Sequence, residues 1–152
     1  MTDAQTPRNE AAADQEPASP TAATTDLIRA TADFLGQFRV THVATLTTRI
    51  DLSEERMHRE FLRFRRDLER RSRTRVGWAM VMEYTHVGRV HIHAVLDVQR
   101  LSVQEIQRSW QPGFSKIQVF DPERGWLRYF AKEIPRGATW SLGGLIELPE
   151  AA

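Results

Sequence analysis

The sequence predicts an α+β fold of the ferredoxin-like or RRM-like kind: an antiparallel sheet of about five strands, with helices packed on one face and the other face open. Two observations support this prediction. The apolar patterns follow one another in the order strand, helix, strand, strand, helix, strand, which is the order of the split βαβ plan. The length of 152 residues fits a single domain with a single core.

Composition limits the classes of protein to which the chain can belong. With 41% hydrophobic and 27% charged residues, it has the composition of a globular protein. Its apolar runs are too short to span a bilayer, so we expect no membrane partner and a location in the cytoplasm of a host cell. The chain has no cysteine, which excludes disulfides, thiolate metal sites and cysteine nucleophiles. Any chemistry must therefore use histidine, tyrosine, carboxylates or hydroxyls.

The two ends of the chain are expected to lie outside the domain. Residues 1–24 are rich in Ala, Thr, Pro and acids and have almost no large apolar side chain, which predicts a disordered acidic tail. This tail carries a net charge of −3 and the remainder +4, so the total of +1 conceals a basic domain. We predict the domain at residues 25–148 and a short tail at 149–152.

The first half of the domain should contain a helix, a strand and a long helix. Residues 26–38 are typical of a helix, and the β-branched residues 40–48 are typical of a strand. Residues 53–71 predict a second helix, because two glutamates suit its N-terminal end and apolar residues recur at spacings of four, three and four. The stripe consists of Met57, Phe61, Phe64 and Leu68. The same region is rich in arginine.

The second half should contain a hairpin, a short helix, a strand, a last helix and an edge strand. Residues 77–84 and 90–98 are separated by five residues that include a glycine, which is a hairpin signal. Ser102 and Glu105 form a capping box for the helix that follows. The remaining elements are predicted at residues 116–120 (strand), from Asp121 to just before Pro135 (helix) and at 139–148 (edge strand).

A histidine pair on the second hairpin strand predicts a metal site. His91 and His93 point to one face because side chains alternate along a strand. In the register that the five-residue loop favours, Glu83 faces His91, so the three side chains converge. Two imidazoles and a carboxylate admit Mn, Mg, Zn or Fe. The alternative is a pair of histidines lining a half-exposed strand, and a slip of one residue would move Glu83 to the other face.

The last predicted helix carries a candidate nucleophile. Helical projection places Tyr129, Lys132 and Arg128 opposite the apolar arc. Lys132 lies one turn beyond Tyr129, close enough to share a substrate phosphate. The other tyrosine, Tyr84, shares a strand face with apolar residues and is expected in the core. If a tyrosine acts as nucleophile, it is therefore Tyr129; the alternative is a tyrosine at a helix margin with its hydroxyl in water.

Taken together, these motifs resemble those of a known family. The threonine-rich strand segment 44–48, Glu83 eight residues before His91-Ile92-His93, and Tyr129-x-x-Lys132 downstream are similar to the motif series of HUH endonucleases. They most resemble the single-tyrosine rolling-circle replication initiator (Rep) proteins, over residues 40–134. Relaxases typically place the tyrosine ahead of the histidines, and single-tyrosine transposases have glutamine where this chain has lysine.

The resemblance implies a function and a set of residue roles. It implies the HUH endonuclease fold and metal-dependent, site-specific nicking and joining of single-stranded DNA through a 5′-phosphotyrosine intermediate, initiating rolling-circle replication of a plasmid or virus. Tyr129 would be the nucleophile, Lys132 would neutralise or orient the phosphate, and Glu83, His91 and His93 would hold a divalent ion, Mn or Mg first. Residues expected to contact DNA are Thr45, Thr47 and Arg128. Single-stranded origin DNA and a helicase supplied in trans are the expected partners.

Two other functions stay open on the sequence alone. One is a single-tyrosine transposase or relaxase-like nuclease that serves DNA mobility. The other is a catalytically silent RRM-like module, whose sheet face would carry stacking aromatic residues. The predicted open face carries a glutamate and two histidines instead, which favours a metal site. Whether the arginine-rich helix contacts DNA is also open, because it would lie on the sheet face opposite the metal.

Overall fold

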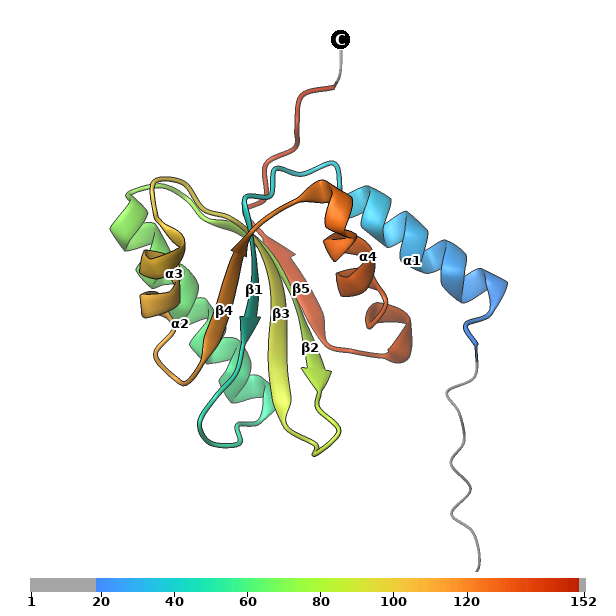
Figure 1. The fold of residues 1–152 in the computed structure, drawn as a ribbon, viewed down its shortest axis with the longest axis horizontal. Coiled ribbons are helices and arrows are strands. Elements are labelled where there is room, and N and C mark those ends of the chain that lie inside the picture. Colours follow the sequence, from blue (N-terminus) through green and yellow to red (C-terminus); the bar gives the residue numbers. More distant parts are fainter. Residues whose placement is uncertain (1–18, 151–152) are drawn as a thin grey trace, which may run out of the picture.

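The strands assemble into one antiparallel sheet in the computed structural model, which describes residues 19–150 (Figure 1). The strand order is β4-β1-β3-β2-β5, and every neighbouring pair is antiparallel. The strands are β1 (His42–Leu46), β2 (Gly77–Tyr84), β3 (Val90–Asp97), β4 (Ser115–Val119) and β5 (Trp140–Gly143). The predicted α+β class, with its five antiparallel strands, is confirmed.

Helices connect the strands and begin and end where local sequence signals place them. The α-helices of the described residues are α1 (Ala22–Leu35), α2 (Glu54–Ser72), α3 (Val103–Ser109) and α4 (Trp126–Ala131). The Ser53 hydroxyl caps α2, and the predicted capping box of Ser102 and Glu105 is present at α3. Within residues 19–150, no helix combines the length and apolar character needed to cross a bilayer.

The region after β4 differs from its prediction. The sequence predicts one continuous helix from Asp121, but the structure has a short 3-10 helix, η1 (Pro122–Arg124), then α4, then a second 3-10 helix, η2 (Ile134–Arg136). The break lies at Gly125, whose φ of 68° is left-handed and ends the first turn. As a result, α4 has only six residues, with Tyr129 near its middle.

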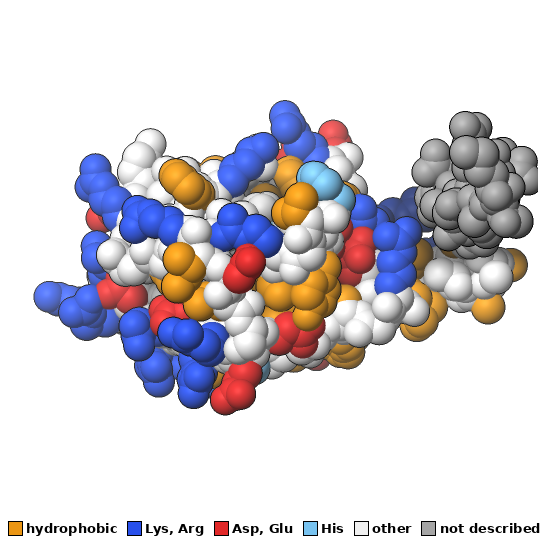
Figure 2. All heavy atoms as spheres, turned by 90° about the horizontal axis from the view of Figure 1, so that it is seen from below, with side chains coloured by type: hydrophobic (Ala, Val, Ile, Leu, Met, Phe, Trp, Pro, Cys, Tyr) orange, Lys and Arg blue, Asp and Glu red, His pale blue; other side chains and the backbone are white. Residues whose placement is uncertain are grey.

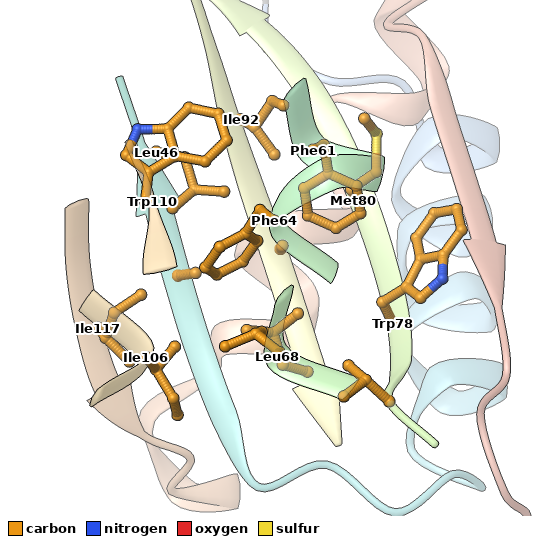
Figure 3. Close-up of a cluster of buried hydrophobic side chains, with 14 of the residues drawn as sticks. Leu46, Phe61, Phe64, Leu68, Trp78, Met80, Ile92, Ile106, Trp110 and Ile117 are labelled. Carbon is orange, nitrogen blue, oxygen red and sulfur yellow. The ribbon is translucent and has the colours of Figure 1, made fainter. Parts of the chain in front are cut away.

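One face of the sheet carries the main core, formed with α2 and α3 (Figure 3). The predicted stripe of α2 is buried at all four positions. In Figure 3 it meets side chains from the strands and from α3, which include Leu46, Met80, Ile92, Ile106 and Ile117. Two edge-on aromatic pairs add to it, Phe61 with Trp78 and Phe64 with Trp110, with ring centroids 5.2 and 5.7 Å apart.

The prediction that helices pack on one face only is wrong, because α1 and α4 cover part of the opposite face (Figure 1). Leu35 of α1 and Phe130 of α4 are buried there against small apolar strand residues, namely Val43, Ala79, Val81 and Val95. These residues line the face beside the histidine pair and would be exposed without a cover, which would cost about 25 cal/mol per Å² of apolar surface. The open part of this face is thus confined to its polar end.

The predicted tail boundaries fall close to the limits of the described residues. Residues 1–18, most of the predicted N-terminal tail, and 151–152 at the other end lie outside the described residues. The predicted tail extends to residue 24, whereas α1 begins at Ala22, with the Thr21 hydroxyl accepting a hydrogen bond from the Thr24 amide. A polar side chain at the helix N-terminus therefore extends the helix into a segment that composition alone assigns to the tail.

Truncation of Leu68 to alanine is expected to destabilise the fold by about 3 kcal/mol, since a fully buried leucine leaves a cavity when shortened. Leu68 is 0% exposed at the centre of the main core. Thermal or urea unfolding followed by circular dichroism measures the loss. The matched control is Leu27→Ala in α1, where the residue is 49% exposed and the expected cost is below about 0.5 kcal/mol. Equal losses in the two variants would contradict this description of the core.

Candidate active site

The β2–β3 hairpin sets the positions of the three predicted metal ligands. Its register pairs Tyr84 with Val90, Glu83 with His91 and Val81 with His93, as the five-residue loop predicts. Because directly paired residues project from the same side of the sheet, Glu83 and both histidines lie on one face. All three side chains are half-buried, so they are accessible from solvent and still partly protected from it.

The three ligand atoms converge on one point. Glu83 Oε2 lies 2.8 Å from His93 Nε2 and 3.2 Å from His91 Nε2, and the two Nε2 atoms are 2.9 Å apart. Atoms bound at ~2.1 Å in adjacent positions of an octahedron lie ~3.0 Å apart, compared with ~3.4 Å in a tetrahedron. The donor set and its spacing therefore fit a divalent cation that takes mixed nitrogen and oxygen ligands and keeps further positions open.

His93 is the most constrained of the three ligands. Thr45 of β1 is its direct partner across the sheet, and Thr45 Oγ1 lies 3.3 Å from His93 Nδ1. This contact leaves Nε2 facing the cluster, an arrangement typical of metal-binding histidines. Burial, followed by the neighbouring His91, lowers the pKa of His93, while Glu83 acts in the opposite direction. The neutral imidazole that results is the form that can donate a lone pair to a cation.

Tyr129 approaches the cluster from α4. Its ring packs edge-on against the ring of His93, with centroids 5.3 Å apart, and the residue remains 41% exposed. Lys132 Nζ lies over the Tyr129 ring, 3.8 Å from its centroid, and 3.8 Å from Oε1 of the buried Glu133. The helix that covers the second face of the sheet thus brings the predicted nucleophile and the predicted phosphate-binding lysine beside the predicted ligands.

The other tyrosine is not in the core, contrary to expectation. Tyr84 ends β2 and is 57% exposed, and its hydroxyl donates a hydrogen bond of 2.8 Å to Glu54 Oε1 of α2. The strand extends beyond the apolar surface of α2 at this point, so the ring meets a polar helix end instead of the core. Since Tyr84 projects from the α2 face, Tyr129 is the tyrosine that faces the histidine cluster.

The three residues predicted to contact DNA occupy different surroundings. Thr45 is half-buried and contacts His93, as described above. The hydroxyl of Thr47 donates to the Phe114 carbonyl oxygen at 3.1 Å, which joins the ends of β1 and β4. Arg128 is exposed on α4, next to Tyr129. Their contacts with DNA stay predictions.

A groove beside the cluster contains residues that the sequence does not single out. It has a volume of about 520 Å³ and extends from His91 to the loops at the end of the sheet. Its lining comprises Thr47, Thr48, Arg49, Thr85, His86, Val87, Arg89, Val90, His91 and Phe114. Phe114 is 73% exposed, an unusual position for a phenylalanine. Its only sequence signal is an aromatic residue directly after Pro112-Gly113, which does not indicate whether the ring is buried.

Comparison with known proteins gives one match. No curated protein and no solved structure matches the chain significantly. A family model described as Replication-associated protein ORF2 matches residues 41–137. The matched stretch begins just before β1, ends just after η2, and contains the three predicted ligands, Tyr129 and Lys132. Because this match covers more than half of the chain, the protein belongs to the Replication-associated protein ORF2 family, a family of rolling-circle replication initiators.

Proposed function

We propose that the protein initiates rolling-circle replication by nicking single-stranded DNA at a specific site and holding the cut strand on Tyr129. The observation that carries the proposal is the position of the Tyr129 ring, 5.3 Å from the ring of His93 and next to the Glu83, His91 and His93 cluster. Membership of a replication initiator family supports a DNA substrate. A phenol, a cation-binding cluster and a lysine are the groups that a phosphodiester transfer needs.

The transfer exchanges one phosphate ester for another. Tyr129 Oη forms a bond to phosphorus while the bond from phosphorus to the 3′ oxygen breaks. The phenol gives up a proton and the departing oxygen takes one up, leaving a free 3′-hydroxyl and a 5′-phosphotyrosine. A divalent cation bound by Glu83, His91 and His93, with Mn²⁺ or Mg²⁺ as the proposed ions, would withdraw charge from the nonbridging oxygens. The ester retains the energy for later rejoining by a DNA 3′-hydroxyl.

Lys132 is positioned to offset the charge of the reacting phosphate. Its ammonium lies over the Tyr129 ring, and the buried carboxylate of Glu133 lies 3.8 Å away, which restrains the long lysine side chain. A restrained positive charge beside the attacking phenol favours the approach of a negatively charged phosphodiester and the build-up of negative charge on oxygen. We therefore assign Lys132 to the binding and orientation of the phosphate.

The groove beside His91 supports an unpaired DNA strand as the substrate. It begins at one of the predicted ligands, so a strand lying in it reaches the reacting phosphate directly. Phe114 offers an exposed ring on which an unpaired base can stack, and Arg49 and Thr47 line the same groove. A base in a duplex has no free face for such stacking. We propose that origin DNA enters the site as a single strand through this groove.

A selection experiment tests the proposal and identifies the origin sequence at the same time. The full chain is incubated with 3′-labelled single-stranded oligonucleotides that contain a randomised central stretch, once with Mn²⁺ and once with excess chelator. Label that migrates with the protein under denaturing conditions is expected only with Mn²⁺, and sequencing of the attached strands should recover a common sequence. Attachment that persists in chelator, or release of the label without attachment, would contradict the proposal.

Replacement of Phe114 by alanine is expected to weaken binding of the selected strand by about tenfold, since one aromatic–base stack contributes roughly 1–3 kcal/mol. Fluorescence anisotropy with the labelled strand measures the change. Phe114→Trp should restore the affinity, and Val119→Ala, a truncation of another exposed apolar residue, should leave it unchanged. If the alanine variant binds as tightly as the wild type, the strand does not stack on Phe114.

A further inference from the structure

The solvent side of α2 carries a continuous line of arginines. We call it the arginine ridge: Arg56, Arg59, Arg63, Arg66, Arg70 and Arg73, all exposed. The spacings of three, four, three, four and three residues follow the helical repeat, so the side chains form one line along the helix. By projection, this line lies opposite the buried stripe that contains Phe61 and Leu68. The ridge is therefore the part of α2 that faces furthest from the core.

The ridge keeps a net positive charge after its internal ion pairs are counted. Arg59, Arg63 and Arg70 pair with carboxylates of their own helix, at Glu55, Glu60 and Asp67. The other three members have no ion pair within the part of the chain that the structure describes. From Arg56 to Arg75 the sequence has nine arginines and three acids. In Figure 2, Lys and Arg side chains crowd toward the lower left of the molecule, where α2 lies.

The dimensions of the ridge suit an extended polyanion. From first to last arginine it spans 17 residue steps, or ~25 Å at the helical rise of 1.5 Å, which corresponds to roughly seven base pairs at 3.4 Å each. Beside it, a groove of about 370 Å³ between α2 and α3 adds the polar side chains of Ser109 and Gln111. Guanidinium groups bind phosphate with two parallel hydrogen bonds. None of these features selects a base sequence.

The position of the ridge rules out the strand being cut as its ligand. α2 packs on the sheet face opposite Glu83, His91 and His93, so a strand lying at the cluster is separated from the ridge by the sheet and its core. We infer that the ridge binds the phosphate backbone of double-stranded DNA, in the duplex that borders the single-stranded nick site. The choice of DNA as the polyanion rests on the proposed function; the ridge itself does not.

The test compares two charge-matched double variants of the full chain. Arg59→Gln/Arg66→Gln removes two ridge charges, and Arg29→Gln/Arg124→Gln removes two exposed arginines of α1 and η1, on the other side of the sheet. Binding of a labelled random-sequence duplex is followed by anisotropy over a series of salt concentrations. The ridge variant should bind about tenfold more weakly, and its slope of log affinity against log salt should flatten by about two. The control should match the wild type.

Each outcome separates this inference from the proposed nicking reaction. Both variants should nick a short single strand as the wild type does, since neither changes the cluster or Tyr129. The inference is overturned if the wild type does not bind the duplex, if the control loses as much affinity as the ridge variant, or if the ridge binds polyglutamate or anionic vesicles in preference to duplex. Duplex binding that depends on the ridge, in a chain that never attaches to a single strand, would instead overturn the nicking proposal and leave this one standing.

Discussion

Replacement of Tyr129 by phenylalanine is expected to abolish covalent attachment to DNA, with a loss of at least about a thousandfold in rate, as is typical when an enzyme loses its nucleophile. The change removes a single oxygen atom and keeps the ring, so the edge-on contact with His93 and the contact with Lys132 are retained. Folding and strand binding should therefore be unchanged. Denaturing gels with the strand selected in Mn²⁺ measure attachment, and anisotropy measures binding.

The chain offers a matched control for this experiment. Tyr84 is the only other tyrosine of the sequence, and it projects from the α2 face, where its hydroxyl bonds to Glu54. Tyr84→Phe should attach to DNA at the wild-type rate and lose at most about 1 kcal/mol of stability, since the lost hydrogen bond is exposed. Attachment that survives in Tyr129→Phe and disappears in Tyr84→Phe would reassign the nucleophile. Attachment that survives in both would exclude a tyrosine mechanism.

The hairpin shows which parts of the site could be predicted from the sequence. Glu83 and His91 are eight residues apart and belong to neighbouring strands, so the loop length and the two-residue period of a strand fix their pairing. The same local logic applies to the stripe of α2 and to the capping box of Ser102, which the structure has as predicted. In each case, the interaction joins residues that are close in sequence, and backbone geometry alone decides which side chains meet.

The features that the sequence does not predict depend on contacts between distant segments. No local pattern reports that Leu35 and Phe130 meet over Val81, because each is compatible with several helix placements. Likewise, Tyr84 has the alternation of a core residue, and only the position where α2 begins decides that it is exposed. Phe114 is exposed because the loop before β4 leaves the apolar surface, which single-residue hydrophobicity does not reveal.

The placement of α1 and α4 matters for the function as well as for the fold. A sheet with helices on one face only would leave the last helix behind the sheet, with Tyr129 on the wrong side of the histidines. Because α1 and α4 pack on the histidine face, the residue that the motif order identifies as nucleophile lies beside the cluster. The apolar residues at one end of this face thus serve the site at the other end, since they hold the helix that carries Tyr129.

Replacement of a single cluster residue is expected to remove metal binding without unfolding the protein. In Glu83→Gln and His91→Ala, the affinity for Mn²⁺ should fall by about a hundredfold or more, because even residues that only support a ligand contribute ten- to a hundredfold. Isothermal titration calorimetry measures the affinity directly. Wild-type protein should also gain about 2.7 kcal/mol of stability when free Mn²⁺ is a hundred times its dissociation constant, and the variants should gain none at the same concentration.

His86→Ala is the control for these variants, since it removes an exposed histidine of the same hairpin loop that lies outside the cluster. It should bind Mn²⁺ as the wild type does. In the absence of metal, the cluster variants should melt no lower than the wild type, because the half-buried ligand atoms lie close together without a cation to bind them. Unchanged Mn²⁺ affinity in both cluster variants would contradict the metal site, whereas a loss in His86→Ala would place the cation toward the hairpin loop instead.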